Sequence, residues 1–262
     1  LRRGVELGVI DDFTLDLDAA VEQADILVVC TPTLIAADML AEILPRLQRG
    51  GRSPVITDVA SVKGNLRDAA VNAMGTMPPQ LVLAHPIAGS ERSGVEASDA
   101  DLFVNHRVIL TPQEGNDPAA VELVRAMWVS TGAEVVDMAV TEHDAVLAAT
   151  SHLPHVLAYA LVDALAQSPA SRDIFRFAAG GFRDFTRIAS SDPAMWRDIA
   201  IANKHALLDA IDLFSEHLGQ LRQAVQDEDG EQLFSTFARA KAARDEFAAT
   251  LAGRSQPKAS EP

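Results

Sequence analysis

The sequence is poor in cysteine, in aromatic residues and in basic residues relative to acidic ones. A single cysteine, Cys30, excludes an intrachain disulfide, which fits a reducing compartment such as the cytoplasm. The 22 basic and 37 acidic residues give a net charge of −15, which argues against nucleic acid and anionic membranes as partners. An anionic small molecule would therefore need a local basic site, because the overall field repels it.

The chain also lacks long apolar runs. No apolar stretch reaches about 18 residues, so the sequence predicts no membrane span. Arg2 and Arg3 are not followed by an apolar segment, so we expect no signal peptide. Cys30 ends the apolar run 26–30, where we expect it to be a small core residue. The hydrophobic content of 48% indicates a globular protein rather than a disordered one.

Short apolar runs alternate with helical patterns through the first half of the chain. This alternation predicts a parallel sheet that is covered by helices on both faces. We expect strands at 25–30, 55–58, 81–84, 107–110 and 134–136, with helices at 36–47, at 66–74 and after Pro118.

From about Thr141 the sequence predicts long helices that are rich in alanine and leucine. Apolar residues recur at three- and four-residue spacing in 142–166 and 193–218, and a final amphipathic helix covers 229–251. Asp192 before Pro193 is typical of a helix start. We place a boundary near Met138, between an α/β domain at 1–138 and a helical domain at 139–252, with a disordered polar tail at 253–262.

The segment with the most chemical potential is 84–96, AHPIAGSERSGVE. It places His85 in a turn-rich segment directly after an apolar run. A histidine on a loop at a strand end can act as a general base near pH 7. The alternative is a histidine that is bonded to its own loop backbone.

Three further groups carry candidate chemistry. Ser61 follows a predicted strand, where its hydroxyl could bind a ligand or cap the helix that begins near Asn65. His152 and His155 are three residues apart and would share one helical face, as metal ligands or, more commonly, as core residues. No third ligand stands at suitable spacing, so we expect no metal. Arg183 and Arg187 flank Asp184, and either one could hold a carboxylate or pair with that aspartate.

Four segments in order resemble the prephenate dehydrogenase family, which includes prephenate, arogenate and cyclohexadienyl dehydrogenases. They are TDVASVKG at 57–64, the His85 segment, SHLPH at 151–155, and GGFRDFTRIA at 180–189 followed by DPAMWR at 192–197. The resemblance covers about residues 1–213. One feature departs from the family pattern: no Gly-x-Gly-x-x-Gly turn is present, and the sequence starts inside the second helix of a dinucleotide-binding domain. We expect that an N-terminal piece precedes Leu1 or that the pyrophosphate site has been lost.

The resemblance implies a Rossmann-like parallel sheet, truncated at its N-terminus, followed by an all-α dimerisation domain. It also implies NAD-dependent oxidative decarboxylation of prephenate or arogenate to 4-hydroxyphenylpyruvate or tyrosine, without a metal. The choice between NAD and NADP stays open. The apolar faces of the helices are wider than a small domain can bury, which fits a homodimer or packing on the first domain.

Roles for the site residues follow from the same resemblance. His85 matches the base that takes the hydroxyl proton, and Ser61 orients that hydroxyl. Arg187 matches the residue that grips the ring carboxylate. His155 matches the position at the side-chain end of the substrate and leans toward prephenate over arogenate, and His152 belongs to the same pocket.

Other positions are expected at the border of this pocket. Glu91 would tie the His85 loop to the partner domain, unless it is only a surface carboxylate. Trp196 would wall the pocket, unless it is a core residue. Ligands lie beyond the carboxyl ends of parallel strands, which assigns cofactor contacts to Thr31, Pro32, Ala60 and Ser61.

Two other functions compete with this one. The missing glycine-rich turn is also typical of a catalytically inactive substrate-binding or dimerisation fragment. A dehydrogenase of 3-hydroxy acids shares the order of domains and uses a helical lysine, for which Lys204 is the candidate. The His85 segment and the segment 182–188 argue against that second function.

Overall fold

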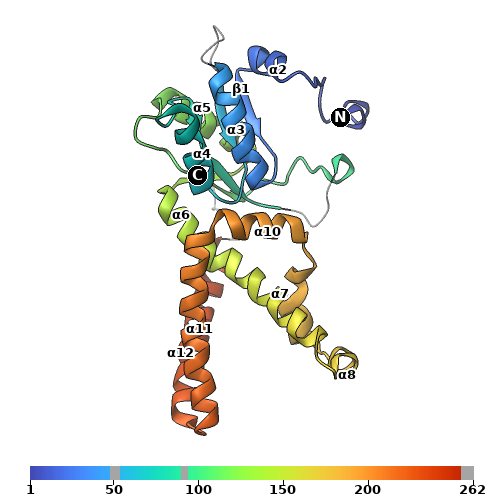
Figure 1. Ribbon diagram of the computed structural model, residues 1–262, viewed down its shortest axis with the longest axis vertical. Coiled ribbons are helices and arrows are strands. Elements are labelled where there is room, and N and C mark those ends of the chain that lie inside the picture. The colour runs from blue at the N-terminus through green and yellow to red at the C-terminus, as the bar shows by residue number, and fades with distance from the viewer. Residues whose placement is uncertain (48–53, 90–93, 255–262) are drawn as a thin grey trace, which may run out of the picture. The chain divides into compact units, whose positions relative to one another are not determined.

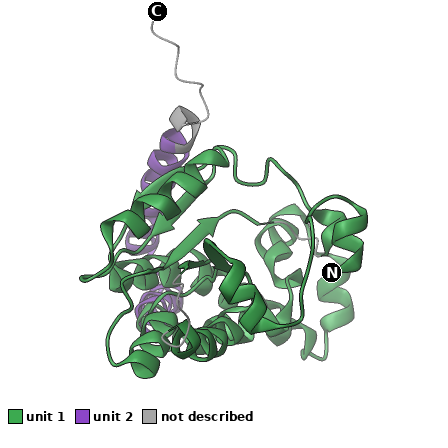
Figure 2. Cartoon of the chain, turned by 90° about the horizontal axis from the view of Figure 1, so that it is seen from above, with its two compact units in different colours: residues 1–210 green, residues 211–262 purple. Residues whose placement is uncertain are grey.

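The computed structural model describes residues 1–47, 54–89 and 94–254 (Figure 1). The chain divides into two compact units, Leu1–Ala210 and Ile211–Pro262 (Figure 2). The predicted boundary near Met138 falls inside the first unit. Of the predicted tail, Gly253 and Arg254 belong to the last helix and residues 255–262 lie outside the described residues.

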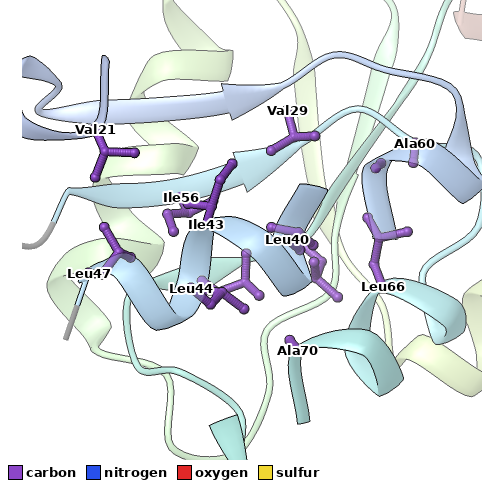
Figure 3. Packing of buried hydrophobic residues seen from close by; sticks show 13 residues of the cluster. Val21, Val29, Leu40, Ile43, Leu44, Leu47, Ile56, Ala60, Leu66 and Ala70 are labelled. Atoms are coloured by element: carbon purple, nitrogen blue, oxygen red, sulfur yellow. The ribbon is translucent and has the colours of Figure 1, made fainter. Parts of the chain in front are cut away.

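A parallel sheet opens the first unit. Its strands are β1 (Ile26–Val29), β2 (Val55–Asp58) and β3 (Leu81–Val82), in that order, with Val29 opposite Asp58. Helices α3 (Thr33–Leu47) and α4 (Gly64–Met74) follow the first two strands. Leu40, Ile43 and Leu44 of α3 pack against Ile56 of β2 with no exposed surface (Figure 3). Burial of these aliphatic side chains fixes the sheet under the helices.

A second sheet contains β4 (Ala84–Ile87), β5 (Arg107–Leu110) and β6 (Glu134–Asp137). β4 and β5 run antiparallel, whereas β5 and β6 run parallel and are joined through helix α5 (Pro118–Ser130). The expectation of a uniformly parallel sheet is wrong at β4. Antiparallel neighbours need no helical crossover, and the described residues between β4 and β5 hold only the short 3₁₀ turn η1 (Val95–Ala97).

Strand β1 forms the edge of the first sheet in the described part of the chain. Val28 is 37% exposed there, although the run it belongs to is apolar. Cys30 follows β1 and is exposed, so the prediction of a core cysteine is wrong. The reason is positional, because a strand that is paired on one side covers only part of its side chains. Two short helices, α1 (Arg2–Glu6) and α2 (Leu17–Gln23), precede this strand.

The remaining elements are helical. They are α6 (Val140–Leu147), the π turn η2 (Ala148–His152), α7 (Leu153–Ala166), α8 (Ser171–Arg176), α9 (Gly180–Thr186), the 3₁₀ turn η3 (Arg187–Ser190), α10 (Pro193–Ala202), α11 (Lys204–Gln226) and α12 (Gly230–Arg254). The long helix expected at 142–166 is therefore interrupted by a π turn, and the one expected at 193–218 breaks at Asn203. Asp192 caps α10 as predicted, since its side chain accepts from the amides of Ala194 and Met195.

The continuous helical run Val140–Ala166 is long and apolar enough to cross a membrane by length and composition alone. This segment was not predicted from the sequence, because only uninterrupted apolar runs were considered and a few polar residues are spread along 140–166. Those polar residues include His143 and His152, which are buried in the first unit and hydrogen-bonded within it. Such contacts are typical of a core helix.

Candidate active site

A fully buried ion pair underlies the site. Asp58 ends β2, and Lys63 lies five residues later on the loop that leads to α4; neither side chain is exposed. Asp58 also accepts from the amides of Ala60 (2.9 Å) and Ala84 (3.1 Å), and Lys63 Nζ donates to the carbonyl of Ala84 (2.6 Å). Burial lowers the pKa of Lys63, while the Asp58 carboxylate opposes that shift. The pair therefore holds both backbone groups of Ala84.

The residue after Ala84 is His85, which the structure places in strand β4 rather than on a loop. Its backbone lies opposite Ile109 of β5, and the residue is 8% exposed. Its Nδ1 lies 2.9 Å from Nε2 of His143 on α6. The ring is therefore bonded to a side chain of helix α6 and not to the backbone of its own segment. The grip on Ala84 and the bond to His143 fix both the position and the direction of the ring.

His143 and Asp144 were not anticipated from the sequence. His143 is fully buried, and its Nδ1 lies 2.8 Å from Oδ1 of Asp144. The same carboxylate accepts from the backbone amides of Lys63 (2.9 Å) and Gly64 (2.8 Å) at the start of α4. The only signal in the sequence is an adjacent His-Asp pair at a helix start.

Asp144 also excludes one of the two interpretations of Ser61, that of a helix cap. Helix α4 begins at Gly64 with Lys63 as its N-cap residue, and no N-cap side chain bonds to it. Its first amides are satisfied by Asp144, which lies about 80 residues away in sequence. Ser61 is therefore not the cap of α4, and it remains half-buried on the loop between β2 and that helix.

Burial favours the neutral form of two histidines of the site, His85 and His152. Burial lowers the pKa of His85 well below 6.5, and Lys63, His143 and His152 act in the same direction. Burial also lowers the pKa of His152 to about 4, although Asp144 opposes that shift. Near pH 7 both imidazoles are uncharged, which leaves a ring nitrogen able to accept a proton.

His152 and His155 both contact Trp196 of α10. His155 stacks on the indole with ring centroids 3.5 Å apart, and His152 meets it edge-on at 6.1 Å. Asn203, at the end of α10, bonds to Nδ1 of His152 (3.0 Å) and to the carbonyl of Asp144 (2.8 Å). Within the described residues, the buried Nε1 of Trp196 has no hydrogen-bond partner.

Arg187 lies near this group at the start of η3. Burial lowers the pKa of His155, and the charge of Arg187 adds to that effect, which places the guanidinium within electrostatic reach of the ring. Tyr159 of α7 donates to the carbonyl of Ser191 (2.6 Å) and so fixes the end of the η3 turn. Arg183 is exposed and pairs with Asp184 at 3.2 Å. Glu91 lies outside the described residues.

The predicted cofactor contacts gather at one edge of the first sheet. Thr31 and Pro32 follow β1, and Ala60 and Ser61 follow the adjacent parallel strand β2. The carboxyl ends of parallel strands meet at one edge, so both loops lie beyond the same edge. In the described chain, the buried atoms Thr33 Oγ1 and Asn65 Oδ1 beside these loops lack hydrogen-bond partners.

Comparison with known families assigns nearly the whole chain. The family described as prephenate dehydrogenase, nucleotide-binding domain, matches residues 1–137, and prephenate dehydrogenase, dimerization domain, matches residues 139–239.

Individual relatives agree with this assignment. Prephenate dehydrogenase of Bacillus subtilis is 41% identical over 92% of this chain, which spans 64% of that protein's length. Cyclohexadienyl dehydrogenase of Zymomonas mobilis is 36% identical over 92% of this chain and 81% of its own. The crystal structure of Aquifex aeolicus prephenate dehydrogenase in complex with hydroxyphenyl propionate and NAD+ matches with a TM-score of 0.83 and 36% identity, over 94% of this chain and 85% of its own.

Removing one partner of the buried ion pair should destabilise the protein strongly. Lys63→Met leaves Asp58 charged and unpaired in the interior, so we expect a loss of about 3–5 kcal/mol in the free energy of unfolding. Urea denaturation followed by circular dichroism measures it. The matched control is Arg46→Met, which removes the surface ion pairs of Arg46 with Asp18 and Glu42 and should change stability little. Equal stability of Lys63→Met and the wild type would contradict the structural role of the pair.

Proposed function

Because the chain belongs to the prephenate dehydrogenase family, we propose that it catalyses the NAD-dependent oxidative decarboxylation of prephenate or arogenate to 4-hydroxyphenylpyruvate or tyrosine. The observation that carries this proposal is the neutral, buried His85, whose neighbour Ala84 is bonded to Lys63 of the loop that also carries Ser61. The reaction needs a base for a ring hydroxyl, a grip on the carboxylates and a place for the nicotinamide.

His85 supplies the base. A neutral imidazole can take the hydroxyl proton as the C–H bond on the same carbon breaks, and a base near neutral pH contributes typically 10²–10⁴-fold to such a step. One of its nitrogens is engaged by His143, which leaves the other nitrogen for the substrate. Ser61, on the loop beyond β2, would orient the hydroxyl toward this nitrogen.

The residues at the sheet edge fit the nicotinamide half of the cofactor. Thr31, Pro32, Ala60 and Ser61 lie beyond two adjacent parallel strands, next to unpartnered buried oxygens of Thr33 and Asn65. When bound there, NAD would accept the hydride of the ring carbon; NADP is the alternative. The protein's part is to hold the two reacting carbons in line at close range.

Arg187 would hold the ring carboxylate, since a guanidinium offers two parallel donors to a carboxylate. This local cation matters in a chain with a net charge of −15, whose overall field repels a dianion. His155 and Trp196 form a stacked wall beside it, and His152 closes that wall from the edge. Loss of the ring carboxylate as CO2 makes the ring aromatic, which supplies the driving force.

We also propose that the chain forms a homodimer through its helical domain. The proposed location of the enzyme is the cytoplasm. The second compact unit leaves Leu213, Val225, Phe234 and Phe237 more than half exposed. Exposed apolar side chains of this size usually mark a protein interface. The family domain that matches residues 139–239 bears the description of a dimerization domain, which supports the same surface.

The function is tested by titrating NAD into the 262-residue chain in a calorimeter and then following NADH formation with prephenate and with arogenate. Binding of NAD, together with turnover of one of the two substrates, would support the proposed dehydrogenase activity and identify the substrate. A folded chain that does not bind NAD and does not turn over either substrate would favour the alternative function, an inactive substrate-binding or dimerisation fragment.

Replacing the base should slow turnover strongly without preventing substrate binding. We expect His85→Asn to lower kcat by about 10²–10⁴-fold, the usual cost of losing a general base, with little change in the Kd for prephenate. Steady-state kinetics and calorimetry measure the two effects. His106→Asn, which alters an exposed histidine, serves as the control. A loss of only a few-fold in His85→Asn would remove this residue from the role of base.

Replacing the guanidinium should weaken substrate binding. Arg187→Ala is expected chiefly to raise KM for prephenate, because a hydrogen-bonded charge pair to the substrate contributes about 1.5–3 kcal/mol. The matched control is Arg183→Ala, four residues away, whose exposed guanidinium pairs with Asp184. An unchanged KM in Arg187→Ala would show that this arginine does not hold the carboxylate.

A further inference from the structure

We propose that Asp144 and His143 form a positioning relay for His85, which fixes its proton on Nδ1 and leaves Nε2 as the base. The relay runs from the Asp144 carboxylate through His143 to His85, with links of 2.8 Å and 2.9 Å. It deepens the proposed function by naming two positioning residues and the reacting nitrogen of His85.

The direction of the two hydrogen bonds follows from Asp144. Burial would raise the pKa of Asp144, but the bonds from His143 and from the amides of Lys63 and Gly64 lower it below its ordinary value. An ionised carboxylate only accepts hydrogen bonds. Nδ1 of His143 must therefore carry the proton of that bond.

The same logic fixes His85. A neutral imidazole has one N–H donor and one acceptor nitrogen, so His143 with a proton on Nδ1 offers Nε2 as an acceptor. His85 must then donate from Nδ1 to His143. This leaves Nε2 of His85 unprotonated, with its lone pair free to take a proton from a substrate hydroxyl.

The relay also compensates for an unfavourable charge environment. The titratable groups around the His85 ring are Lys63 from the β2–α4 loop, His143 from α6 and His152 from η2, and all three oppose a positive charge on it. Asp58 is paired with Lys63, whereas the Asp144 carboxylate reaches His85 through His143. A cationic His85, formed when it takes the proton, is stabilised through this route.

Two features keep the relay in place. His143 is fully buried and the Asp144 side chain is 13% exposed, which limits competition from water and strengthens both bonds. A glycine at position 64 leaves room for the carboxylate, because a Cβ there would lie 2.7 Å from Asp144 Oδ2. The start of α4 is thus shaped around Asp144.

The test compares His143→Phe with His143→Gln. Phenylalanine fills the space without an acceptor, whereas the glutamine amide oxygen can replace Nε2 and accept from His85. We expect His143→Phe to lower kcat for prephenate by about 10²-fold, with KM near the wild-type value, and His143→Gln to recover most of that loss. The control His106→Gln should leave kcat unchanged. Wild-type kcat in His143→Phe, or equal losses in both His143 variants, would overturn the relay.

Long-range proton–nitrogen NMR spectra of the chain with labelled histidine provide a readout that does not depend on turnover. The His85 signals are assigned from their loss in His85→Asn. A proton on Nδ1 in the wild type, which moves to Nε2 in His143→Phe, would support the relay. A proton on Nε2 in the wild type would overturn it, even in a chain without dehydrogenase activity.

Gly64→Ala disturbs the relay without altering either histidine. The added methyl group displaces the Asp144 carboxylate, so we expect a lower kcat and a weakened preference for the Nδ1 proton of His85. The matched control is Gly219→Ala, where a Cβ would meet nothing within 4 Å. If both glycine variants retain wild-type kcat and the wild-type His85 proton position, the relay is overturned.

Discussion

The contact on which the site depends is the buried pair of Lys63 and Asp58 around Ala84. A lysine without exposed surface is costly to bury, and it is tolerated because an aspartate and a backbone carbonyl surround it. The pair joins the end of β2 to the start of β4, so two strands that belong to different sheets keep one relative position. His85 and Ser61 each lie within three residues of a member of this cluster. Their separation is therefore set by a rigid polar cluster and not by the two loops themselves.

Much of the fold follows from the sequence, because its strands are short apolar runs and its helices have clear starts. The predicted strands at 55–58 and 107–110 and the cap Asp192 are confirmed. The antiparallel pairing of β4 and the exposure of Cys30 were missed, since both depend on which neighbour a strand finds. The π turn was not predicted, because one extra residue changes the three- and four-residue spacing of apolar side chains too little to be noticed.

The sequence predicts several side chains of the candidate site but not the hydrogen bonds that join them. His85, Arg187, His152 and His155 stand out as chemically capable side chains. The structure places His152 and His155 against Trp196, with Arg187 within electrostatic reach of His155. Asp144 does not stand out, because a carboxylate at a helix start is ordinary. Its contacts with Lys63 and Gly64 span about 80 residues, a distance over which spacing carries no information. Long-range hydrogen bonds of single side chains are what sequence patterns leave out.

The π turn at 148–152 has a consequence for the substitutions that this segment tolerates. In a regular α-helix, about 100° per residue would put His143 and His152, nine residues apart, on opposite faces. A π turn holds one residue more than an α-helical turn, so the two imidazoles lie roughly 80° apart around the helix axis instead. His143 is bonded to His85, and His152 is bonded to Asn203. An α-helical turn in place of this π turn, with no residue removed, would rotate His155 and the rest of α7 by about 100° relative to α6. The segment therefore tolerates only those substitutions that keep the wider turn.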